Sequence, residues 1–91
     1  MAEEEDKAWQ RLDKFLFFAR FCKSREVAGE LIERGAVRIN RQPTEKPHAK
    51  LRPGDVLTLA LARGVVVAKV LTLPPRRGPA SEARQLYEEI A

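Results

Sequence analysis

The chain has 91 residues and a formal net charge of +4, which suits one small domain with a single hydrophobic core rather than two. Its one cysteine excludes an internal disulfide and is typical of a reducing cytosol, and no apolar run reaches the roughly 20 residues that span a bilayer. We therefore expect a soluble, cytoplasmic protein that does not associate with membranes.

The positive charge is concentrated in the middle of the chain. Residues 3–6 are all acidic, and Glu88 and Glu89 add two negative charges near the other end. Residues 7–87 contain all 17 lysines and arginines but only 7 of the 13 acidic residues, a net charge of +10. Such a body favours polyanions, nucleic acid among them. We expect residues 1–10 to form an acidic leader outside the folded domain.

The first periodic stretch begins at Arg11 and predicts a helix. One face of this helix carries Leu12, Phe15, Leu16, Ala19 and Cys22. A second face carries Phe17, Phe18 and Phe21 beside Arg11 and Lys14. An aromatic stripe among cations can stack unpaired bases. Such stripes are more often core, so we expect these rings to be covered by the sheet or by the end of the chain.

A second helix follows, with Ser24 as its N-cap and Gly35 at the position of a left-handed C-terminal cap. Its apolar stripe consists of Val27, Ala28, Leu31 and Ile32. Three glutamates occupy the opposite face: Glu26, Glu30 and Glu33. These carboxylates would repel phosphate, so only the ends of this helix suit contact with a nucleic acid.

Strand patterns dominate the rest of the chain. Alternation over 37–40 predicts a half-buried strand, and residues 56–61 and 65–71 predict a hairpin after the turn at 52–55. The stiff basic connector "PPRRGP" then leads to 81–90, where apolar spacing predicts an amphipathic helix that docks on the body. The expected fold is α+β: two N-terminal helices on a small, mainly antiparallel sheet, with a C-terminal helix. The domain would span 11–73, and 74–91 would form the linker and docked helix.

The candidate binding residues gather where helices begin and end. Lys23, Ser24 and Arg25 lie at a helix start, where free backbone N–H groups and the helix dipole favour an anion. Arg20 lies at the exit of the preceding helix. The alternative is purely structural: Ser24 only caps its helix, and surface arginines such as Arg34 pair with a neighbouring glutamate.

The strand after Gly35 adds Arg38, Asn40 and Arg41, although Asn40 is equally well explained by the turn that follows. Catalytic and metal-binding patterns are missing from the sequence. The single histidine, His48, has no partners for a zinc site, and neither Ser81 nor Cys22 has an evident histidine partner. We expect no enzymatic activity, no cofactor and no metal.

The run "RLDKFLFFARFCKSREVAGELIERGAVRIN" closely resembles the S4-type RNA-binding domain, and "KLRPGDVLTL" matches its later turn and strand. The residues that carry this resemblance are Arg11, Leu12, Asp13, Ser24, Arg25, Ala28, Gly35, Val37 and Asn40. The stretch "RRGPASEARQLYEE" is similar to the family of small ribosome-associated heat-shock proteins of the fifteen-kilodalton class.

The resemblance implies binding to ribosomal RNA on the large ribosomal subunit, in particular free subunits that carry a nascent chain as peptidyl-tRNA. It places the RNA contacts at Arg11, Lys14, Arg20, Lys23, Ser24, Arg25, Arg38 and Asn40, and it implies that Asp13 holds the first helix in place. Arg41 stands where the family commonly has glycine, so the turn is of another type or strained, and Arg41 is a further candidate phosphate contact.

The expected function is therefore noncatalytic recognition of structured ribosomal RNA by a monomer, in ribosome recycling or the heat-shock response. Two alternatives remain open. One is an accessory module that serves an RNA-modifying enzyme or binds a protein partner. The other treats residues 11–34 as a helix-turn-helix with its second helix in the major groove of DNA, which the glutamate-lined face of that helix disfavours.

Overall fold

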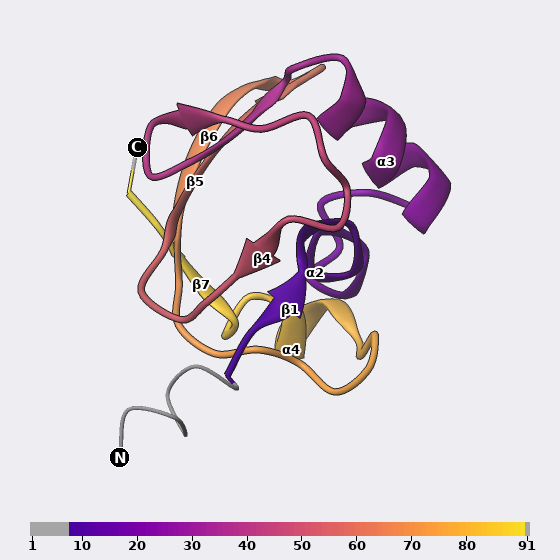
Figure 1. Cartoon of the computed structure of the whole chain (residues 1–91). Coiled ribbons are helices and arrows are strands. Elements are labelled where there is room, and N and C mark those ends of the chain that lie inside the picture. The colour runs from indigo at the N-terminus through magenta and orange to yellow at the C-terminus, as the bar shows by residue number, and fades with distance from the viewer. Residues whose placement is uncertain (1–7, 91) are drawn as a thin grey trace.

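The computed structural model describes residues 8–90, which form an α+β fold as expected. Figure 1 shows the helices α2 and α3 on one side and the long strands β5 and β6 on the other. The elements are β1 (Gln10–Arg11), α2 (Leu12–Phe18), α3 (Arg25–Glu33), β2 (Val37–Ile39), β3 (Gln42–Pro43), β4 (Lys50–Leu51), β5 (Val56–Leu61), β6 (Gly64–Val70), α4 (Ala80–Ala83) and β7 (Tyr87–Glu89). Most of the expected leader lies outside the described residues, and its last residue, Gln10, already belongs to β1.

The main sheet has five strands in the order β3-β2-β5-β6-β7, and every pairing in it is antiparallel. The predicted hairpin is confirmed: Val56 pairs with Lys69 at one end and Leu61 with Gly64 at the other. A separate pair of short strands, β1 and β4, ties the start of α2 to the loop that precedes β5. These two-residue strands have no periodicity from which they could be predicted.

The core lies between the two helices and the sheet. Leu12, Phe15 and Leu16 of α2 are fully buried, and they belong to one cluster with Ile32 of α3 and Leu59 of β5. The alternating pattern of β5 places Leu57 and Leu59 inside, as the sequence predicted. At about 25 cal/mol per Å² of apolar surface, this burial is the main source of stability that fixes the helix pair on the sheet.

Both helices end in the same backbone arrangement. After α3, the N–H groups of Gly35 and Ala36 donate to the carbonyls of Ile32 and Leu31, with Gly35 at φ 83°, as its sequence position predicted. The first helix stops at Phe18, earlier than its apolar pattern, because Arg20 adopts φ 65° in the same role. A left-handed conformation costs a residue with a side chain about 1–2 kcal/mol, so Arg20 must be held by its surroundings.

The C-terminal segment departs from the prediction of one helix over 81–90. The helix α4 covers only Ala80–Ala83, and Tyr87–Glu89 instead form β7, which pairs with the free edge of β6. Ala83 is buried and Leu86 and Tyr87 are half-buried, so the segment does dock on the body. The apolar spacing that suggested a helix is overruled because an open sheet edge offers the backbone hydrogen-bond partners.

Candidate nucleic-acid interface

The first part of the candidate interface is the start of α3. The Ser24 hydroxyl accepts a hydrogen bond from the N–H of Val27 at 3.1 Å, so the predicted N-cap is confirmed. Lys23 and Arg25 flank this cap and are exposed. The cap occupies the N–H of Val27 and leaves those of Arg25 and Glu26 without a partner in the helix, beside two cations, which is a favourable arrangement for an anion.

Asp13 joins this helix start to the start of α2. Its carboxylate accepts two hydrogen bonds from Arg11, from Nε at 3.1 Å and from Nη2 at 3.0 Å, and Arg25 Nη2 lies 3.5 Å from the same carboxylate. Asp13 is only 6% exposed, whereas the side chains of Arg11 and Arg25 are each 46% exposed. One buried carboxylate therefore fixes two guanidinium groups from different elements in one solvent-facing cluster, here called the Asp13 clamp.

The start of α2 is closed to ligands by the protein backbone. The N–H groups of Leu12 and Asp13 donate to the carbonyls of Ala49 and Pro47, at 2.9 and 3.0 Å. Asp13 thus holds the first helix in place through its backbone and orients the arginines through its side chain. The cations at this end, rather than the helix terminus itself, are available for binding.

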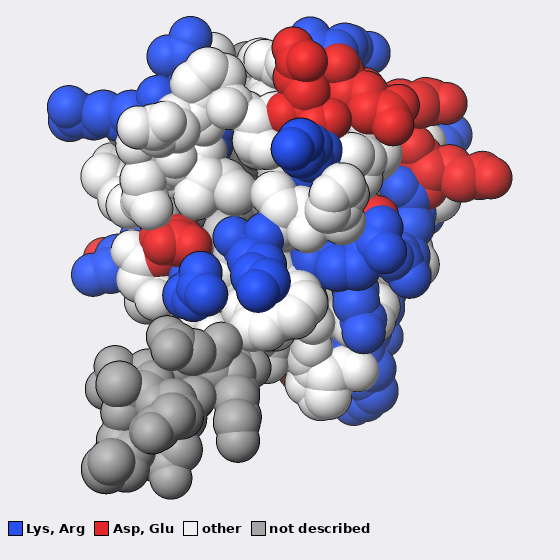
Figure 2. Space-filling model, in the orientation of Figure 1, with Lys and Arg blue, Asp and Glu red and all other residues white. Residues whose placement is uncertain are grey.

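Lys14 lies in α2 and Arg20 just after its end. Lys14 Nζ lies 5.5 Å from the centre of the Phe18 ring, and Arg20 Nε donates to the carbonyl of Gly78 at 2.7 Å. Figure 2 shows cations gathered over α2, below the acidic flank of α3 at the upper right. Separating the two charges keeps the glutamates of α3 away from the cationic surface.

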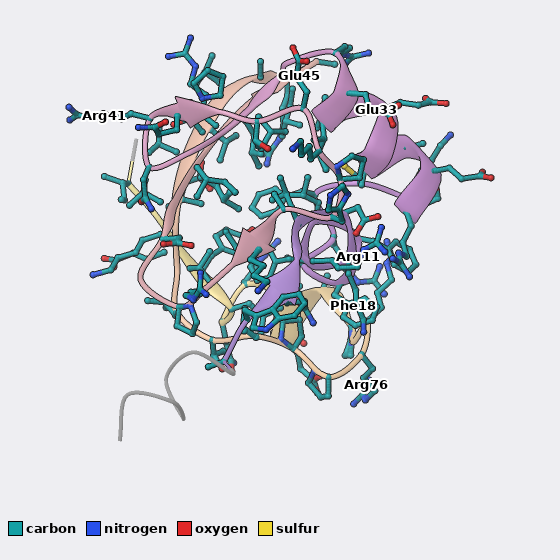
Figure 3. The ribbon with its side chains drawn as sticks, in the orientation of Figure 1. Arg11, Phe18, Glu33, Arg41, Glu45 and Arg76 are labelled. Atoms are coloured by element: carbon teal, nitrogen blue, oxygen red, sulfur yellow. The ribbon has the colours of Figure 1, made fainter. Side chains whose placement is uncertain are left out.

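The hairpin residues Arg38, Asn40 and Arg41 lie apart from this cluster. In Figure 3, Arg41 projects from the left edge of the molecule, whereas Arg11 lies to the right of its centre. The nine predicted contacts therefore do not form one continuous corner. Five of them lie around the starts of α2 and α3, here called the helix corner: Arg11, Lys14, Lys23, Ser24 and Arg25. Arg20 follows the other end of α2, and Arg38, Asn40 and Arg41 lie in the β2–β3 hairpin.

The amide of Asn40 is used within the protein. Its Nδ2 donates to Asp55 at 3.0 Å, and its Oδ1 accepts from the N–H of Val56 at 2.9 Å. Both Asn40 and Arg41 have positive φ values, 53° and 70°, as a two-residue type I′ hairpin turn requires. Arg41 thus holds a left-handed backbone conformation in this turn, which glycine would adopt without strain.

The sequence did not reveal the role of the basic connector between β6 and α4. Arg77 lies over the Phe17 ring at 4.6 Å and donates from Nε to the carbonyl of Phe17 at 3.0 Å. Arg76 extends the line formed by Arg11 and Phe18 in Figure 3. The connector was recognised as basic, but nothing local showed that it folds back on α2 and lengthens the cationic surface.

The three phenylalanines of the aromatic stripe are half-buried, so they form neither a fully buried part of the core nor a fully exposed surface for stacking bases. Phe17 is covered by Arg77, and Phe21 packs against Tyr87 with ring centres 4.6 Å apart. The connector and the end of the chain thus cover two of the three rings in part, whereas the sequence led us to expect all three in the core. Phe18 faces Lys14 instead, so it belongs to the cationic side of α2.

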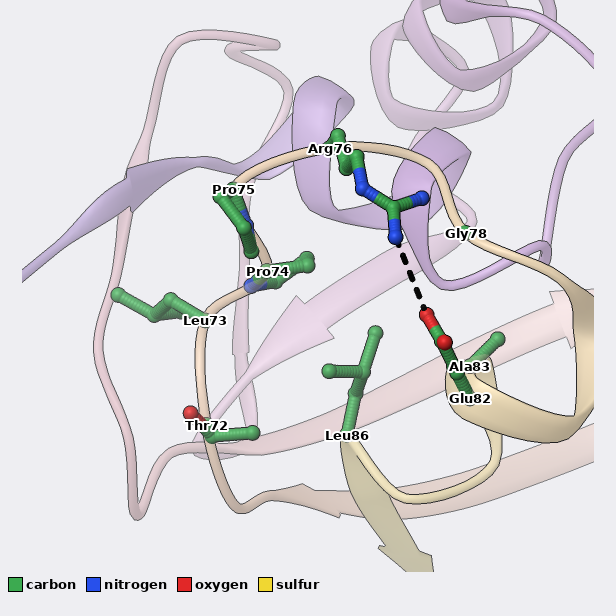
Figure 4. Close-up of a pocket in the computed structure, with 9 residues that line it drawn as sticks. All are labelled: Thr72, Leu73, Pro74, Pro75, Arg76, Gly78, Glu82, Ala83 and Leu86. Carbon is green, nitrogen blue, oxygen red and sulfur yellow. Dashed lines mark ion pairs between the residues drawn. The ribbon is translucent and has the colours of Figure 1, made fainter.

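A mainly apolar pocket of about 180 Å³ lies beside the connector (Figure 4). It is lined by residues 72–76, Gly78, Glu82, Ala83 and Leu86. Arg76 and Glu82 form an ion pair of 3.7 Å across it. Because this pair compensates its only charges, the pocket does not suit a phosphate group.

Nothing in the described part of the chain suggests a reactive centre. Burial raises the pKa of the Cys22 thiol, which disfavours the nucleophilic thiolate. Across residues 8–90, His, Cys, Asp and Glu side chains form no group of three that could hold a metal ion. No helix in that range is both long and apolar enough to cross a membrane.

Comparison with known proteins identifies the family of this chain. Residues 10–57, more than half of the chain, match the model of the S4 domain, so the chain belongs to the S4 domain family. The resemblance inferred from the sequence motifs is thereby confirmed.

Individual similar proteins give more detail than the family match. The chain is 43% identical over 81 residues to heat shock protein 15 of Escherichia coli, which covers 89% of this chain and 60% of that protein. It is 34% identical over 80 residues to the RQC P-site tRNA stabilizing factor of Listeria monocytogenes, covering 88% of this chain and 85% of that protein. The chain thus spans less than two thirds of the Escherichia coli relative but most of the Listeria one.

A solved structure agrees with both fold and family. Heat shock protein 15 of Vibrio cholerae superposes with a TM-score of 0.85 at 36% identity, covering 91% of this chain and 83% of that one. That structure is described as trimeric, so the expectation that this protein is a monomer has no support from its relative.

Proposed function

We propose that this protein is a noncatalytic RNA-binding protein of the cytoplasm that recognises structured ribosomal RNA on the large subunit. The observation that carries the proposal is the Asp13 clamp, which presents Arg11 and Arg25 as a fixed pair beside the capped start of α3. The relative from Listeria is named for stabilising P-site tRNA, which supports a large subunit still carrying peptidyl-tRNA as the target.

The clamp suits phosphate recognition for two reasons. Each guanidinium is nearly half exposed, so it retains N–H donors for a phosphate while one edge is held by the carboxylate. Holding the side chains in advance reduces the rotamer entropy that binding would otherwise remove. Neutralising phosphates also releases condensed counterions, which makes the affinity depend steeply on salt.

Shape selects RNA over duplex DNA in this proposal. The outer flank of α3 carries Glu26, Glu30 and Glu33, all exposed, so this helix would meet repulsion in a major groove. A fixed corner of cations with an acidic boundary instead fits the folded backbone of a structured RNA, where recognition rests on phosphates and 2′-hydroxyl groups.

The test compares two variants that each lose two positive charges. Lys23→Gln with Arg25→Gln removes cations from the helix corner, and Arg34→Gln with Lys69→Gln removes exposed cations elsewhere. We expect the corner variant to bind a large-subunit ribosomal RNA fragment about 10- to 100-fold more weakly, with a log–log salt slope shallower by about 2.

The control should lose far less than the corner variant, and circular dichroism should show both variants folded. Equal losses in the two variants would mean that only overall charge matters, and the corner would not be the site. Competition with duplex DNA in the same titration measures the preference for RNA.

A further inference from the structure

A second cationic hollow lies at the opposite end of α2 from the Asp13 clamp. It has a volume of about 240 Å³ and is lined by three arginines from separate parts of the chain. Arg20 follows α2, Arg63 lies in the β5–β6 turn, and Arg84 ends α4. Three guanidinium groups brought together by tertiary structure are a stronger sign of anion binding than a run of cations in the sequence.

The hollow is a built feature of the fold. The floor of the hollow includes Ala19 and Ala83, which are 2% and 3% exposed. Their small methyl side chains leave room for a ligand above them. Tyr87 lines one side and is held by its contact with the Phe21 ring, 4.6 Å between centres. The floor and this side therefore belong to the packed body, whereas the three arginines around them are exposed.

Arg20 is positioned for a ligand at a conformational cost. Its backbone has φ 65°, and its Nε donates to the carbonyl of Gly78 at 2.7 Å. This hydrogen bond restrains the guanidinium group and uses only its Nε donor, so the Nη donors remain for a ligand. An arginine in this state loses little further freedom on binding an anion.

The charge in the hollow is uncompensated by the described residues. No aspartate or glutamate lines it. Within residues 8–90, the ion pairs are Arg11–Asp13, Arg25–Asp13 and Arg76–Glu82, so none involves the three arginines of the hollow. Glu82, the nearest carboxylate in sequence to Arg84, is already engaged by Arg76.

From this arrangement we propose that the Arg20–Arg63–Arg84 hollow binds a phosphodiester group of a second RNA segment, distinct from the one at the Asp13 clamp. The inference rests on the proposed function and adds a second contact to it. The seven residues of α2 separate the two sites by about 10 Å of helix, so one RNA fold would be held at two points. Two fixed points define the orientation of the RNA, which one cationic corner does not.

The experiment replaces Arg63 and Arg84 with glutamine and leaves Arg20 intact, because Arg20 also supports the backbone. Affinity for the large-subunit RNA fragment should fall about 5- to 30-fold, with the salt slope shallower by about 1 to 2. A matched variant, Arg63→Lys with Arg84→Lys, keeps the charge and should keep most of the salt slope. Hydroxyl-radical footprinting should show one protected RNA segment lost, and a different segment lost in the Lys23→Gln, Arg25→Gln variant.

The outcomes separate this inference from the proposed function. Wild-type affinity and footprint in a folded Arg63→Gln, Arg84→Gln variant would overturn the second site while leaving the first untouched. Loss of the same RNA segment in both variants would also overturn it, since only one site would exist. Weaker binding to intact subunits with unchanged binding to protein-free RNA would identify an acidic protein surface as the ligand and refute RNA. If only the Lys23→Gln, Arg25→Gln variant binds RNA like the wild type, the Asp13 clamp is not an RNA contact, and the site in the hollow is supported.

Discussion

Two aspartates organise the two polar regions of this protein, and they do so in different ways. Asp13 binds side chains: its carboxylate holds the guanidinium groups of Arg11 and Arg25, which remain partly exposed. Asp55 organises a turn: it accepts from the amide of Asn40 and from the backbone N–H of Arg52. The same residue type thus prepares a surface for a ligand in one place and fixes the path of the chain in the other.

The difference follows from what surrounds each carboxylate. Asp13 is a buried residue of the first turn of α2, and two partly exposed arginines lie within reach of its carboxylate, so its oxygens are used by cations that face solvent. Asp55 lies after a Pro-Gly pair, where backbone donors point inward and need acceptors. Changes at the first aspartate should alter RNA binding, whereas changes around the second should alter stability.

The largest effect is expected from Asp13→Asn. The variant keeps the side-chain volume but loses the charge that orients both arginines, and we expect RNA affinity to fall about tenfold. The free energy of unfolding should fall by about 1–2 kcal/mol, a value kept low because both arginines are nearly half exposed. Anisotropy titration and urea denaturation measure the two quantities.

The sign of the binding change makes this variant informative. Removing a negative charge would strengthen RNA binding if only net charge mattered, so tighter binding would contradict the clamp. Asp55→Asn provides the control, because it removes the same charge from the turn that Asp55 organises.

A smaller effect, confined to stability, is expected from Asn40→Ala. The change removes two hydrogen bonds and places alanine at φ 53°, so the free energy of unfolding should fall by about 1–2 kcal/mol. Asn40→Gly separates the two causes, because glycine tolerates the backbone angle but makes neither bond. RNA affinity measured on the folded variant should stay within about twofold of wild type. A larger loss would mean that Asn40 contacts the RNA directly.

Local signals in the sequence predicted much of this fold. Ser24 and Gly35 mark the two ends of α3, and the alternation in 56–61 gives both the strand and its buried face. The segment 81–90 was misjudged because its spacing suits a helix, and only the unpaired edge of β6 makes Tyr87–Glu89 a strand. Such an edge exists only once the rest of the chain has folded.

In the candidate site, too, local signals predicted one part and the tertiary packing decided the other. The cations at the start of α3 were found from spacing, but the pairing of Asp13 with Arg25 requires α2 and α3 to be packed together. The convergence of Arg20, Arg63 and Arg84 joins residues more than sixty positions apart, and no single-sequence pattern predicts it. Sequence reasoning located the charged residues, whereas the tertiary fold decides which of them act together.

The smallest effect should come from Arg41→Gly, which tests whether the hairpin group adds to binding at all. Arg41 has φ 70°, a conformation that costs a residue with a side chain about 1–2 kcal/mol. Glycine removes this strain but loses about 0.5–1 kcal/mol through its greater freedom in the unfolded chain. We expect the free energy of unfolding to rise by about 0.5–1 kcal/mol, and Arg41→Ala, which keeps the strain, should show no such gain. Because Arg41 projects from an edge of the molecule away from Arg11, both variants should lose no more than about threefold in RNA affinity, a change of less than one unit in the salt slope. A larger loss shared by glycine and alanine would mean that the RNA reaches around to the hairpin, and the division between a binding aspartate and a turn-forming one would no longer hold.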